Sequence, residues 1–115
     1  MIKVIFYTDN ENRIMKYTVS GHAGYSTKGK DIVCAAVSVL AETTLMALNE
    51  VCGIGENLID YSIDEENGIL NVSIPSKLSK GQLHDASIVL KTMEVGIKAL
   101  LESYPKYITL EYGGV

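Results

Sequence analysis

Hydrophobic and polar residues alternate along several short stretches of the chain, as they do in strands with one buried face. The alternation is clearest over residues 13–20, where Met15, Tyr17 and Val19 share one face. Further strands are expected from the same pattern or from short apolar runs bounded by turn residues: residues 2–8, 58–63, 69–74 and 107–112. Polar turn residues join the first two strands, and the Asn67-Gly68 pair predicts a tight hairpin between the middle two.

Two longer segments predict helices. Residues 82–104 are amphipathic, with a polar linker expected before them at Ser76 to Gly81. The segment from Asp31 to about Val51 is apolar around nearly its whole circumference in the first half. A helix on one side of a sheet needs only one apolar stripe, so we expect a second cover for this helix. In a chain of this size that cover would be the same helix of a second subunit, which predicts a homodimer.

The expected order is therefore ββαββαβ: an α+β fold of two layers, with a mostly antiparallel sheet and two helices packed on it. The length of 115 residues and the apolar share of 47% fit one domain covering residues 1–115. A net charge of −4 disfavours direct binding to nucleic acid. The longest apolar stretch, Ile32 to Ala41, is about half a membrane span, and no signal peptide opens the chain, so we expect a cytoplasmic protein without a membrane partner.

The chain has two cysteines, Cys34 and Cys52. On one continuous helix they would lie roughly 27 Å apart, at 1.5 Å per residue, which is too far for a disulfide. Both are then expected to be free thiols in a reducing compartment. Histidines at no ligand spacing argue against a zinc site, so no metal is expected.

The candidate chemistry lies in the loop between the second strand and the first helix. Asp31 is a good N-cap, which places Cys34 in the first helical turn, where the helix dipole favours the reactive thiolate. His22 stands at the other end of the loop and could complete a Cys–His pair. The competing base is His84, but beside Asp85 it has the pattern of a solvated helix start.

The run Gly21-His22-Ala23, followed after a short loop by Gly29-Lys30-Asp31-Ile32-Val33-Cys34-Ala35-Ala36-Val37-Ser38, resembles the ribosomal-processing cysteine protease family, Prp. The resemblance covers the whole chain. It implies a cysteine endopeptidase without a cofactor that trims the N-terminal extension of a ribosomal large-subunit protein, L twenty-seven. By position, it implies Cys34 as nucleophile and His22 as general base. Gly21, Asp31 and Ser38 would support them.

The loop itself is expected to contact the substrate through Gly24, Tyr25 and Gly29, and residues 23–30 are expected to form a mobile lid with weak tertiary anchoring. Asp31 is most simply a cap, although a role in orienting His22 stays open. Ser38 could contact the substrate or simply pack. The backbone N–H of Cys34 is the natural candidate for an oxyanion donor. The rival functions are a ribosome-assembly factor that binds the same protein without cutting it, and a thiol redox sensor.

Overall fold

The computed structural model describes residues 1–28 and 30–115. Its elements follow the predicted order ββαββαβ, with one short 3₁₀ turn added before the third strand. Their bounds are β1 Ile2–Thr8, β2 Ile14–Ser20, α1 Ile32–Glu50, the 3₁₀ turn η1 Glu56–Leu58, β3 Asp60–Asp64, β4 Ile69–Ser73, α2 Lys80–Ser103 and β5 Ile108–Gly114. The prediction of an α+β fold is confirmed.

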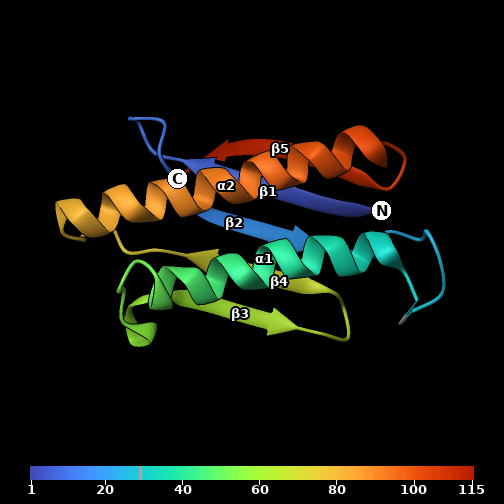
Figure 1. The fold of residues 1–115 in the computed structure, drawn as a ribbon, viewed down its shortest axis with the longest axis horizontal. Helices are drawn as coiled ribbons and strands as arrows, with labels where there is room; N and C mark the ends of the chain where they lie inside the picture. The colour runs from blue at the N-terminus through green and yellow to red at the C-terminus, as the bar shows by residue number, and fades with distance from the viewer. Residues whose placement is uncertain (29) are drawn as a thin grey trace.

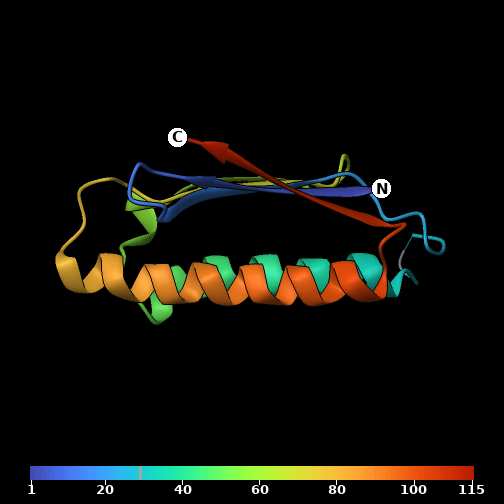
Figure 2. The same ribbon diagram turned by 90° about the horizontal axis from the view of Figure 1, so that it is seen from above.

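The five strands form one sheet in the order β3-β4-β2-β1-β5 (Figure 1). The β1–β5 pair is parallel, and the other three pairs are antiparallel, as expected of a mostly antiparallel sheet. Both helices lie on the same face of the sheet, which gives two layers (Figure 2). The β2–β4 pair in the middle joins the N-terminal hairpin to the central hairpin.

The core fills the space between the sheet and the helices. Phe6 and Tyr17 on the sheet face Val37 and Leu48 of α1 and Ile97 of α2, and all five are fully buried. Burial of each such apolar side chain stabilises the fold by about 1.5–3 kcal/mol. The hydroxyl of Tyr17 donates to the backbone carbonyl of Ala41 at 2.8 Å, so the one polar atom of this aromatic side chain is satisfied inside the core.

Helix α2 begins earlier than the apolar periodicity indicates. Ser79 caps it, accepting from the N–H of Gln82 while the Gln82 side chain accepts from the N–H of Ser79. This capping box satisfies free backbone donors of the first turn and extends the helix back to Lys80. The prediction that the polar linker runs to Gly81 is therefore wrong at its end, because capping here outweighs polar composition.

Helix α2 also supplies part of the second cover that α1 needs. It packs beside α1 in the same layer, while Val33, Val37 and Leu48 of α1 face the sheet. Side chains such as Ile32 and Val39 nevertheless stay exposed. By length and composition alone α1 would be able to cross a membrane, but its buried side chains belong to the sheet–helix core.

Candidate active site

The candidate site lies at one end of the sheet, where three connections meet. Strand β2 ends there, α1 begins there, and the β3–β4 turn folds over the same end, at the right of Figure 1. The β2–β4 register pairs Ser20 with Ile69, so the residues after β2 and before β4 are neighbours. His22, just after β2, and the turn residue Gly68, just before β4, therefore come together at this end of the sheet.

Contact between Gly68 and His22 is direct. Gly68 adopts a positive φ of 63°, and a Cβ atom there would lie 2.9 Å from Cε1 of His22 and 3.2 Å from its Nε2. The bare backbone of the turn thus lies against the imidazole ring and limits where the ring can go.

Gly21 shows why the residue before the histidine is glycine. Its φ is 89°, and a Cβ atom there would lie 2.4 Å from the carbonyl oxygen of Met1. Its own N–H donates to the carbonyl of Gly68 at 3.1 Å. Only glycine combines this backbone conformation with this close approach. The predicted supporting residue Gly21 therefore sets the path of the chain into His22.

Cys34 lies in the first turn of α1, as predicted, and is partly exposed. Its Sγ accepts a hydrogen bond from the backbone N–H of Ala23 at 3.3 Å. That donor immediately follows His22 in the chain, so the histidine and the sulfur are held on adjoining pieces of backbone. No hydrogen bond joins the His22 ring to Sγ among the described residues.

Asp31 is the N-cap of α1, and its carboxylate also binds backbone N–H groups of the preceding loop. One carboxylate oxygen accepts from the N–H groups of Val33 and Cys34 at 3.0 Å each. The other accepts from Tyr25 and Ser26 at 3.0 and 3.2 Å. Burial on its own would raise the pKa of Asp31, but these four backbone donors outweigh it and hold the pKa below its ordinary value.

These bonds bear on two expectations. Both oxygens of Asp31 are engaged by backbone N–H groups, which fits the cap, and among the described residues no hydrogen bond joins Asp31 to His22. The N–H of Cys34, the expected candidate for an oxyanion donor, donates to Asp31 in this structure. The physical reason is that a side-chain cap uses the very amides that a helix start would otherwise offer.

Two clefts open beside Cys34, and His22 and Ser38 line both of them. The first, of about 220 Å³, lies between α1 and the β3–β4 turn, and Gly68 is among its walls. The second, of about 360 Å³, lies between the loop and α1 and is lined also by Gly24, Lys28 and Asp31. The structure thus brings together His22, Cys34 and Ser38, which the sequence singled out separately.

The first half of the loop is better anchored than expected. Besides the two N–H bonds to Asp31, the ring of Tyr25 packs edge-on against Tyr104 and Tyr107, with centroids 5.7 and 5.1 Å apart. Tyr25 therefore faces the α2–β5 connection and lines neither cleft. Gly24 has a φ of 72° and open space around it. Gly29, the third predicted loop residue, lies outside the described residues.

The competing residues lie elsewhere. His84, whose Nδ1 is 3.2 Å from Asp85 Oδ1, lies near the start of α2, at the end of the molecule opposite to the start of α1 (Figure 1). Cys52 is buried; burial and the nearby Asp85 charge raise the pKa of its thiol. Both cysteines are free thiols.

Among the described residues no cluster of His, Cys, Asp and Glu side chains is suited to a metal ion.

Two parts of the site escaped the sequence analysis. The N–H of Ala23 was not recognised as a partner of the sulfur, and Gly68 was assigned only to a hairpin. The Asn67-Gly68 pair marks a hairpin turn in the sequence, but it does not say which residue lies against the turn. That residue is His22, because β4 pairs with β2, and this pairing is known only from the structure.

Known proteins of similar sequence and fold are cysteine proteases. The ribosomal processing cysteine protease Prp of Staphylococcus aureus is 27% identical over 113 residues, which cover 97% of this chain and 99% of that protein. Its counterpart in Mycoplasma pneumoniae is 31% identical over 103 residues, covering 84% of this chain and 85% of that protein. The crystal structure of the S. aureus protease with a covalently linked product peptide superposes with a TM-score of 0.81 at 26% identity, covering 97% of this chain and 99% of that one. The family described as Cysteine protease Prp matches residues 1–109. The chain belongs to this family of cysteine proteases.

Proposed function

We propose that this protein is a cytoplasmic endopeptidase that removes the N-terminal extension of the ribosomal large-subunit protein L twenty-seven, with Cys34 as nucleophile and His22 as general base. The observation that carries the proposal is that Cys34 and His22 line the same two clefts at the start of α1. The S. aureus relative, which was crystallised with a covalently linked product peptide, supports a covalent route. The two free thiols are compatible with a reducing compartment.

The proposed reaction follows from the surroundings of the sulfur. The N–H of Ala23 points at Sγ from 3.3 Å, which places a hydrogen-bond donor beside the nucleophilic sulfur. The thiolate attacks the scissile carbonyl carbon, and the protonated His22 gives its proton to the leaving amine as the C–N bond breaks. Water then attacks the thioester and loses a proton to His22, which releases the acid and regenerates Cys34.

The oxyanion formed at each stage needs donors other than the N–H of Cys34, which is bound to Asp31. We assign one of them to the N–H of Ala23. It already points at Sγ from 3.3 Å, and the carbonyl carbon that becomes bonded to Sγ brings its oxygen into the same region. In this assignment the donor stabilises the thiolate first and the oxyanion afterwards.

The test is cleavage of a peptide that spans the extension and the first residues of the mature ribosomal protein, followed by mass spectrometry. Wild type should cut once, and the Cys34→Ala variant should not cut at all. The Cys52→Ala variant is the matched control, because it removes the other thiol and should keep its activity. Cleavage by Cys34→Ala would refute the mechanism. Binding without cleavage by wild type would favour the ribosome-assembly factor instead.

A homodimer is the second part of the proposal, and its support is the uncovered outer side of the helix layer. Ile32 and Val39 of α1 and Ile88 and Val95 of α2 are all more than half exposed. A groove between the helices, lined by Val39, Val89 and Met93 among others, runs through this surface. A second copy would bury apolar side chains that water otherwise contacts.

Sedimentation at micromolar concentration tests the dimer. Wild type should sediment as a dimer, and Val39→Lys should sediment as a monomer. Val115→Lys adds the same charge at an equally exposed valine outside the helix layer and should stay dimeric. A monomeric wild type would contradict the proposal.

A further inference from the structure

Charge is divided unevenly along this chain. Residues 31–76 contain none of the ten lysines and arginines, although they contain these acidic residues: Asp31, Glu42, Glu50, Glu56, Asp60, Asp64, Glu65 and Glu66. In the fold this segment supplies α1, β3 and β4, which together form one edge of the molecule. That edge is therefore strongly acidic, while the positive charge of the chain lies elsewhere.

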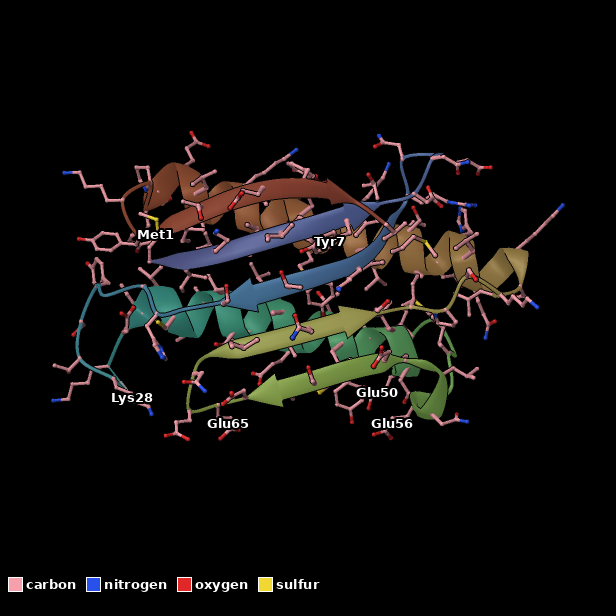
Figure 3. The ribbon with its side chains drawn as sticks, turned by 180° about the vertical axis from the view of Figure 1, so that it is seen from behind. Met1, Tyr7, Lys28, Glu50, Glu56 and Glu65 are labelled. Atoms are coloured by element: carbon pink, nitrogen blue, oxygen red, sulfur yellow. The ribbon has the colours of Figure 1, made fainter. Side chains whose placement is uncertain are left out.

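A groove runs along this edge between α1 and β3. Near Cys34 it is the first cleft described above, whose walls include Glu42 and Glu65. Farther along it continues between the second half of α1 and β3, where Leu45, Met46 and Tyr61 line it with Glu50 and Glu56 at its rim. Ile63 lines both parts. Figure 3 shows Glu65, Glu50 and Glu56 spread along the β3 side of the molecule.

The groove has an apolar floor that is open to solvent in the part of the chain that the structure describes. Ile63 is 49% exposed and Met46 is 54% exposed. Strand β3 is one of the two edge strands of the sheet, and all five of its residues are exposed. An edge strand offers unpaired backbone N–H and C=O groups, which a second extended chain can use as a sixth strand of the sheet.

The carboxylates of the groove form no ion pair with a lysine, arginine or histidine among the described residues. All ion pairs among the described residues lie outside the groove, at Asp9, Glu11, Asp85, Glu94 and Glu111. Glu56 accepts from the Tyr61 hydroxyl at 3.0 Å, a bond that does not neutralise it. Glu42, Glu50 and Glu65 thus present negative charge to whatever occupies the groove.

We propose that this groove binds one flank of the substrate as an extended chain beside β3. Apolar side chains of that flank contact Ile63, Tyr61 and Leu45, and lysine or arginine side chains reach Glu42, Glu50 and Glu65. The distance along α1 from Cys34 to Asn49 is about 22 Å, at a rise of 1.5 Å per residue, which matches roughly six or seven extended residues. The identity of the substrate rests on the proposed function, whereas the groove and its chemical preference rest on the contacts above.

The experiment measures fluorescence anisotropy of the labelled extension peptide on the Cys34→Ala protein. Adding Ile63→Thr should raise Kd about fivefold, the factor expected for losing contact with the exposed part of an isoleucine. Val115→Thr is the control, since Val115 is 72% exposed but follows β5, at the edge of the sheet opposite to β3. Its Kd should not change. Equal Kd values for the two variants would overturn the apolar half of the proposal.

The charge half is tested with two double variants of equal net charge. Glu42→Gln with Glu65→Gln should weaken binding about tenfold at low salt and flatten the salt dependence. Glu102→Gln with Glu111→Gln, outside the groove, should do neither. A peptide in which each lysine and arginine is replaced by glutamine should bind both double variants with the same Kd. If the two Kd values still differ for that peptide, or if Glu42→Gln with Glu65→Gln does not change the Kd of the original peptide, the charge pairing is refuted. Cleavage by wild type decides the proposed function separately, because these binding data stand whether or not the peptide is cut.

Discussion

The contact between Gly68 and His22 permits a sharp test of how the histidine is positioned. Gly68→Ala would place a methyl group 2.9 Å from Cε1 of His22, about half an ångström short of the 3.4 Å at which ordinary contacts begin. The same methyl group would lie 2.9 Å from the carbonyl oxygen of Gly21, which is backbone and cannot swing away. The turn and the imidazole must therefore move apart.

Two effects of this substitution can be separated by magnitude. An L-residue in the left-handed region costs roughly 1–2 kcal/mol of stability, and Gly68 and Gly53 share this conformation, with φ of 63° and 70°. Displacement of the imidazole ring of His22, the proposed general base, is an additional effect. Since a misplacement of about 1 Å can cost about 10²-fold in rate, half of that shift should lower kcat/KM about tenfold.

Gly53→Ala is the control, because a Cβ atom there meets nothing within 4 Å. Both variants should lose stability in urea titrations, Gly68→Ala the more because of its clash with the Gly21 carbonyl, and only Gly68→Ala should lose peptide cleavage at a temperature where both remain folded. If both variants cleave at the same rate, the turn does not hold His22 in place, and the reasoning from the close approach is refuted.

The remaining predictions concern the base, the core and the cap. His22→Ala should lower kcat about 10²–10⁴-fold in the peptide assay, whereas His84→Ala should leave it unchanged; the opposite ranking would mean that the base is misassigned. Tyr17→Phe should lower the unfolding free energy by about 0.5–1.5 kcal/mol in urea titrations, because the buried bond to Ala41 is lost; an unchanged midpoint would contradict this. The lowered pKa of Asp31 means that its ionised form stabilises the fold above the ordinary value of 3.8, and that this contribution disappears as the pH falls through the lower folded pKa. The difference in Tm between wild type and Asp31→Asn should accordingly shrink from about pH 5 to about pH 2, and a constant difference would show that charge is not what Asp31 contributes.

Local patterns predicted the elements and the helix start well. The cap at Asp31, the place of Cys34 in the first turn and the alternation in β2 all depend on residues a few positions apart. Such signals reflect backbone chemistry that operates within one turn or one strand. The start of α2 was placed late, because the capping box at Ser79 lies outside the apolar periodicity.

Features that depend on distant pairing could not be predicted in the same way. The contact of Gly68 with His22 exists only because β4 pairs with β2, and local pattern does not give the order of strands in a sheet. The hydrogen bond from the Cys34 N–H to Asp31 is local by contrast, since it combines the predicted cap at Asp31 with the predicted place of Cys34 in the first turn. The exposure of β3 follows from its position at the edge, since its alternation resembles that of a buried strand.

The β2–β4 pairing has a consequence for folding of the chain during its synthesis on the ribosome. His22 belongs to the first hairpin and Cys34 to the helix that follows it, but Gly68 arrives with the second hairpin. A nascent chain that has folded only its first hairpin and α1 therefore lacks the wall against which the imidazole rests. Such a chain already contains both reactive side chains and still has no formed cleft between α1 and the β3–β4 turn. The first cleft, beside Cys34 and His22, is therefore complete only once strand β4 has joined the sheet, whereas the second cleft is built from the loop and α1 alone.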